Sequence, residues 1–180
     1  MKKSLVIVYA LLACVFQSYS QSELRQQTID SIMNLSFDEF DQNMEGGWRY
    51  YSNKEDFKTA TDLIKLYLEK HPKIESTKRG VISFHCGQML ALLDKNEEAI
   101  PYMEASKMKE NDVMNWDVYV DATIAFLRKD RAAFDKKKAE LKKKSILPED
   151  QNRNLIFLNK LEAHFDKTYQ DAMKEHMKGQ

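Results

Sequence analysis

A nine-residue stretch of the sequence returns in altered form 34 residues later. "ALLDKNEEA", Ala91 to Ala99, is echoed by "AFLRKDRAA", Ala125 to Ala133. In both copies three apolar residues are followed by three polar ones, and an alanine closes the stretch. This order predicts the same unit twice: a helix that ends, a short turn over "DKN" or "RKD", and a second helix that begins. Repetition at a fixed period constrains the fold because each unit must pack on its neighbour.

Apolar residues recur at threes and fours along most of the chain, which is typical of amphipathic helices. The sequence has only five glycines and three prolines, and no useful length of it alternates as a strand would. "EDFKTATDLIKLYLEKHP" is the clearest case, with acids in its first turn and Pro72 after its last. We therefore predict one all-α domain over residues 21–180, with about seven or eight helices.

Residues 1–20 have the order of a secretory signal peptide. Two lysines precede a run of 12 apolar residues, and small residues follow. Such a run is too short to span a bilayer stably. We predict cleavage after Ser20 and a periplasmic or secreted protein. In the alternative, "LLAC", Leu11 to Cys14, acts as a lipobox and the protein is lipid-anchored through Cys14.

The charge of the chain is close to neutral. It has 28 basic and 28 acidic residues, and removal of residues 1–20 takes away only Lys2 and Lys3, leaving a formal charge of −2. This balance argues against nucleic-acid binding, which depends on a basic excess. Only Cys86 remains beyond the signal peptide, so no internal disulfide can form. Stability must then come from packing.

Pairs of antiparallel helices with a 34-residue period resemble the tetratricopeptide repeat, a helix-turn-helix unit that stacks into a superhelix. The residues that fit its pattern are Tyr51, Phe57, Ala60, Ile64, Tyr67 and Pro72 in a first unit, Gly87 and Ala99 in a second, Ala133 in a third, and Tyr169 and Ala172 in a fourth. The resemblance implies a short right-handed superhelix. The steps of 39 residues from Ala60 to Ala99 and from Ala133 to Ala172 require insertions, and the third unit fits almost as well if Ala132 and Ala139 are taken with Trp116. A helical array without this geometry is the alternative.

The resemblance also implies where a partner would bind. In that family the first helix of each pair lines the inner surface, where extended peptides are held. A groove of mixed charge would then be lined by Glu45, Arg49, Asn53, Phe84, Gln88, Asp117 and Asp121. A solvated helix face is the alternative for the same residues.

No catalytic or metal-binding pattern stands out. His85 and Cys86 are neighbours, and neighbours on a helix point about 100° apart, so they cannot share a proton. His71, His85, His164 and His176 lack the spacing of three or four residues that builds a metal site on a helix. We expect no cofactor and no metal.

Two further stretches have a structural interpretation beside a functional one. "KKKAELKKK", Lys136 to Lys144, lies toward a helix C-terminus, where lysines oppose the helix dipole. We interpret it as a solvated helix end, with an anionic partner as the alternative. "GGWRYY" is aromatic enough to mark a binding patch, but Trp48, Tyr50 and Tyr51 are more typical of packed core.

These observations predict an exported, non-enzymatic helical-repeat protein that binds a peptide or protein partner as a scaffold or adaptor. One alternative is an immunity-type inhibitor that neutralises a toxin in the envelope. A less favoured one is a periplasmic hydrolase whose site is formed by distant residues.

Overall fold

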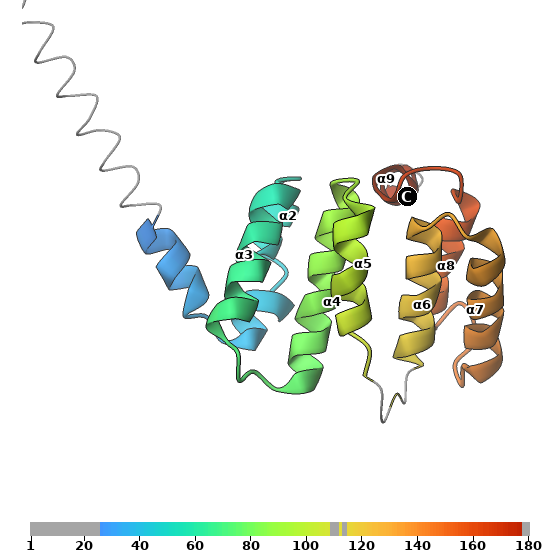
Figure 1. Cartoon of the computed structure of the whole chain (residues 1–180), viewed down its shortest axis with the longest axis horizontal. Helices are drawn as coiled ribbons and strands as arrows, with labels where there is room; N and C mark the ends of the chain where they lie inside the picture. Colours follow the sequence, from blue (N-terminus) through green and yellow to red (C-terminus); the bar gives the residue numbers. More distant parts are fainter. Residues whose placement is uncertain (1–25, 109–111, 113–114, 178–180) are drawn as a thin grey trace, which may run out of the picture.

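The computed structural model describes residues 26–108, 112 and 115–177, and within these ranges the protein is all-α, without strands. This confirms, for the described part of the chain, the prediction of an all-α protein. The helices lie side by side in a row, from α2 and α3 to α7 and α8 (Figure 1). The predicted signal peptide and Cys14 fall in residues 1–25 and lie outside the described residues.

The row is built from helices of one to five turns. Residues 26–33 are helical. The elements that follow are the π-helix η1 (Asp38–Gln42), α2 (Arg49–Ser52), α3 (Phe57–Lys70), α4 (Ser76–Leu92), α5 (Asn96–Ala105), α6 (Trp116–Leu127), α7 (Arg131–Lys144), α8 (Arg153–Ala163) and α9 (Tyr169–Met177).

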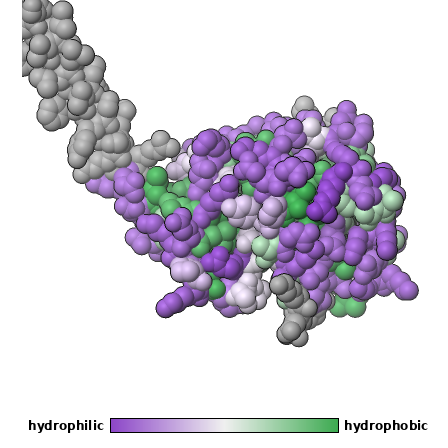
Figure 2. All heavy atoms as spheres, in the orientation of Figure 1, coloured by the Kyte–Doolittle hydropathy of each residue, from purple (hydrophilic) through white to green (hydrophobic). Residues whose placement is uncertain are grey.

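Side-chain caps explain where several helices begin. The carboxylate of Asp56 accepts from the backbone N–H of Thr59 at the start of α3, and Asp130 accepts from Ala133 at the start of α7. Each cap satisfies an N–H group that the first turn of a helix leaves unpaired. Hydrophilic residues cover most of the face shown in Figure 2, with smaller apolar areas between them, as expected of helices that bury one side only.

The turns that join α2 to α3, α4 to α5, and α6 to α7 share one backbone geometry. Each has a residue with positive φ, and the next residue donates its N–H to a carbonyl five positions earlier. The three donor and acceptor pairs are Asp56 and Tyr51 (3.0 Å), Lys95 and Leu90 (3.0 Å), and Asp130 and Ala125 (2.9 Å). The positive-φ residues are Glu55, Asp94 and Lys129. The second and third turns are therefore 35 residues apart in the backbone, one more than the sequence echo predicts.

This shift of one residue changes which side chain is buried in the third unit. At the starts of α3, α5, α7 and α9, one backbone N–H donates to the carbonyl of the capping residue and closes the first turn. These four donors are Ala60, Ala99, Phe134 and Ala172, and all are fully buried. Phe134 therefore stands where the alanine spacing placed Ala133, which is only partly buried. The small residue Gly87 fits the prediction, because a Cβ there would lie 2.6 Å from Cγ of Met103 and 3.1 Å from the carbonyl oxygen of Ala99.

The "GGWRYY" stretch is only partly core. Gly47 has φ +52°, and a side chain there would collide with the backbone of Phe40, so the chain turns sharply before α2. Trp48 is buried, as predicted, whereas Tyr50 is 46% exposed and carries Lys54 over its ring. The aromatic core of this end is completed by the stacked rings of Phe40 and Tyr67, whose centroids are 3.8 Å apart.

Most lysines of the run from Lys136 to Lys144 have acidic partners. The pairs are Lys137 with Asp121, Lys138 with Glu162, Lys142 with Glu149, and Lys144 with Glu140. The run is therefore largely neutralised at its own surface.

In the described part of the chain, no helix combines the length and the apolar character needed to cross a membrane.

Candidate binding groove

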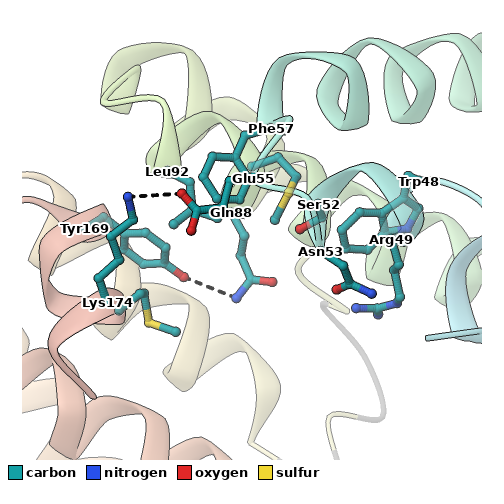
Figure 3. Close-up of a pocket in the computed structure, with 12 residues that line it drawn as sticks. Trp48, Arg49, Ser52, Asn53, Glu55, Phe57, Gln88, Leu92, Tyr169 and Lys174 are labelled. Atoms are coloured by element: carbon teal, nitrogen blue, oxygen red, sulfur yellow. Dashed lines mark hydrogen bonds and ion pairs between the residues drawn. The ribbon is translucent and has the colours of Figure 1, made fainter. Parts of the chain in front are cut away.

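A cavity of about 570 Å³ opens between α2, the start of α3, the end of α4, and α9. Figure 3 shows residues from these elements facing one another across it. Its walls are Trp48, Arg49, Ser52, Asn53, Glu55, Phe57, Gln88, Met89, Leu92, Tyr169, Met173 and Lys174. This volume is typical of ligand pockets, and the walls combine apolar side chains with polar and charged ones. We call this cavity and its walls the groove.

Helix α9 contacts α4 and closes one side of the groove. Burial of Tyr169 and Ala172 fixes the helix there. The side-chain amide of Gln88 donates to the hydroxyl of Tyr169 at 3.2 Å, and Lys174 pairs with Glu55 at 3.3 Å across the groove (Figure 3). Burial raises the pKa of Tyr169, so its hydroxyl stays protonated at neutral pH.

A buried carboxylate supports the α2 side of the groove. Asp41 is fully buried, and its two carboxylate oxygens accept from the indole N–H of Trp48 at 3.0 Å, the amide of Gln42 at 2.6 Å and Nδ1 of His85 at 2.8 Å. Burial alone would raise the pKa of Asp41, but the bonds and charges of His85, Trp48 and Arg49 outweigh burial and lower it. Asp41 is therefore ionised and accepts only, so His85 is the donor in their bond.

Arg49 is held against this cluster. Its Nε donates to the backbone carbonyl of Asp41 at 2.5 Å, and its guanidinium carbon lies 4.4 Å from the ring centroid of Trp48. Partial burial lowers the pKa of Arg49 against the opposing effect of Asp41, yet arginine stays charged at neutral pH. Within the described part of the chain, its two terminal nitrogens have no hydrogen-bond partner. A cation with a free donor edge therefore stands in the groove wall.

Three of the residues predicted to line a groove come together here. Arg49 and Asn53 come from α2 and the residue after it, and Gln88 comes from α4 (Figure 3). Glu45 is exposed in the loop before α2 and is not part of the groove wall. The binding role of all four stays a prediction.

Phe84 does not reach the groove. It is 2% exposed, and its ring packs in the core against Trp116 and Tyr119, with centroids 4.8 and 5.4 Å away. The pattern placed it on an inner helix face, but α6 and its aromatic residues cover that face.

Asp117 and Asp121 also lie elsewhere. Asp121 pairs with Lys107 of the loop after α5 at 2.6 Å and with Lys137 of α7 at 2.7 Å. Asp117 accepts from the backbone N–H of Met108 at 2.7 Å. The two aspartates therefore join α6 to its neighbours and do not line the groove.

The thiol of Cys86 is protonated and shielded from solvent. Its side chain is fully buried, and burial raises its pKa to about 12, so the thiol is protonated at neutral pH. Its neighbour His85 is bonded to Asp41. Among the described residues, no cluster of three or more histidine, cysteine, aspartate or glutamate side chains could hold a metal ion.

Sequence reasoning missed the contribution of α9 to the groove. Tyr169 fits the repeat spacing, but nothing local in the sequence indicates that its hydroxyl meets Gln88, which lies 81 residues earlier. It also missed the bond between Asp41 and His85, which are 44 residues apart.

In comparisons with known proteins, the chain matches no family model, no curated protein and no solved structure.

Proposed function

We propose that this chain is an exported, non-enzymatic binding protein that holds a segment of a protein or peptide partner in the groove between α2, α4 and α9. The observation that carries the proposal is the groove itself: a mostly apolar cavity with polar side chains supplied by elements far apart in the sequence. Such cavities bury apolar side chains of a partner while the polar groups fix its orientation.

The size and composition of the groove favour a flexible segment as occupant. About 570 Å³ accommodates a few side chains, and Met89 and Met173 in its wall can adapt to different shapes. One exposed apolar residue lies next to the groove wall: the backbone carbonyl of Met44 accepts from Asn53, and Met44 is 62% exposed. A partner larger than the cavity could therefore extend over the neighbouring surface.

The finer fold belongs to the same proposal. We propose that the helices form antiparallel pairs stacked in a tetratricopeptide-like right-handed superhelix. The shared geometry of the three turns supports this arrangement, since each turn joins two helices through the same pattern of bonds. The order of residues 1–20 supports export to the periplasm or outside the cell.

Site-specific photo-crosslinking in the producing cells would test the binding site. A photoreactive amino acid at Asn53 lies in the groove wall, whereas the same group at Lys136, an exposed position on α7, serves as the matched control. We expect a discrete adduct with one partner from position 53 and none from position 136. Identical adducts from both positions, or no adduct from position 53, would contradict the proposal.

A further inference from the structure

The groove contains one cation that lacks a carboxylate partner. Lys174 pairs with Glu55. Within the described part of the chain, Arg49 donates only to the backbone carbonyl of Asp41, and the carboxylate of Asp41 accepts instead from His85, Trp48 and Gln42. The terminal nitrogens of Arg49 are therefore free to bond a group that enters the groove.

A partly buried guanidinium without a bonded anion is an unusual arrangement. Burial removes water from the charge, and a desolvated charge is costly unless it is paired and hydrogen-bonded. The bond from Nε to Asp41 and the contact with the Trp48 ring fix the orientation of the guanidinium before any ligand arrives. A fork fixed in this way can bond both oxygens of a carboxylate, and little side-chain freedom remains to be lost.

Apolar side chains lie in the same cavity as this fork. Phe57, Met89, Leu92 and Met173 form walls of the groove together with Arg49. They form an apolar subsite for a large aliphatic side chain. Burial of that side chain would add favourable free energy in proportion to the apolar area removed from water. The groove thus combines one anion-binding group, Arg49, with one apolar subsite.

We infer, on the basis of the proposed function, that the partner segment carries an acidic residue next to an aliphatic one. An aspartate or glutamate side chain bonds the terminal nitrogens of Arg49, and a leucine-like side chain occupies the apolar subsite beside it. A basic residue in place of the aspartate or glutamate would be repelled by the positive charge of Arg49. Trp48 and Asp41 act as positioning residues, since they hold the guanidinium and do not themselves touch the carboxylate.

Defined peptide pools can test this inference on the protein purified after expression of the full-length gene. Three fluorescent eight-residue pools, capped at both ends, carry Glu-Leu, Gln-Leu or Lys-Leu at their central positions and mixed residues elsewhere. Fluorescence polarisation measures their binding. We expect the Glu-Leu pool to bind roughly ten- to a hundredfold more tightly than the Gln-Leu pool, as a charge-assisted bond would give. The preference should weaken as salt is raised.

Variants then assign the preference to Arg49. Arg49→Gln should reduce the preference for the Glu-Leu pool to within about twofold, and Arg49→Glu should favour the Lys-Leu pool. Arg128→Gln, at an exposed position in the turn after α6, is the matched control and should leave the preference unchanged. Circular dichroism checks that each variant folds; if Arg49→Gln does not, Arg49→Glu and the salt dependence of the unsubstituted protein still decide.

The outcomes separate this inference from the function on which it rests. Binding of all three pools with equal affinity, or a preference that Arg49→Gln leaves intact, would overturn the acidic specificity and leave peptide binding standing. Failure of every pool to bind would contradict both. An adduct from position 53 in cells together with no acidic preference would overturn the inference alone.

Discussion

Replacing Asp41 by alanine should cost the protein much of its stability. The substitution leaves the buried indole N–H of Trp48 without its acceptor and removes the bonds from Gln42 and His85. An unpaired buried donor costs about 1–3 kcal/mol, and a bond to a charged group contributes about 1.5–3 kcal/mol. Loss of the buried charge offsets part of this, because a carboxylate is costly to desolvate. We expect Asp41→Ala to lower the free energy of unfolding by about 2–4 kcal/mol.

Urea unfolding followed by circular dichroism measures this loss. With a slope of about 1–3 kcal/mol per molar urea, the midpoint should fall by roughly 1–2 M. Asp38→Ala is the matched control, because Asp38 lies in the same π-helix and is exposed. Its effect should stay within about 0.5 kcal/mol. If both variants lose the same small amount, Asp41 does not organise the α2 side of the groove and the reasoning is refuted.

The effect of Asp41→Ala should also depend on pH. The pKa of Asp41 is lower in the folded protein than its ordinary value, so ionised Asp41 stabilises the fold fully above its unfolded pKa of about 3.9. This contribution is lost as the pH falls through the lower folded pKa. The difference in unfolding free energy between the two proteins should therefore be larger at pH 7 than at pH 3. A difference that grows toward acid would contradict the assignment.

Three further predictions concern the core. Phe134→Ala should lower the free energy of unfolding by about 3–5 kcal/mol, against about 0.5 kcal/mol or less for Ala133→Ser; similar losses would contradict the 35-residue register. Cys86 should react with Ellman's reagent only after denaturation, because it is fully buried and its pKa is raised to about 12; fast reaction of the native protein would be inconsistent with that burial. Gly87→Val should lower the thermal midpoint, since the new Cβ would displace Met103; an unchanged midpoint would show that α4 and α5 do not approach closely.

Much of the fold follows from local signals in the sequence. Helix starts such as Asp56 and Asp130, and the turns at "DKN" and "RKD", depend on residues a few positions apart. The register of the third unit does not follow from such local signals. Alanine is small and neutral enough to lie on either face of a helix, so the position of Ala133 could not show that Phe134 is the buried residue.

The groove was predictable only in part, for a related reason. The resemblance to the tetratricopeptide repeat implied that Arg49, Asn53 and Gln88 line a groove, and these residues do line one cavity. The docking of α9 depends on Tyr169 meeting α4, which no local pattern records. Asp41 looks in sequence like one more acid in a solvated stretch, and only the fold shows that it is buried.

Nuclear magnetic resonance offers the most direct test of the central claim that the groove between α2, α4 and α9 is the binding site. The ¹⁵N-labelled protein would be titrated with the Glu-Leu peptide pool while its backbone amide signals are followed. We expect the signals that shift most to lie in residues 48–57, 88–92 and 169–174, while those of α7 stay in place. Shifts centred on α7, or no shifts at any peptide concentration, would contradict it.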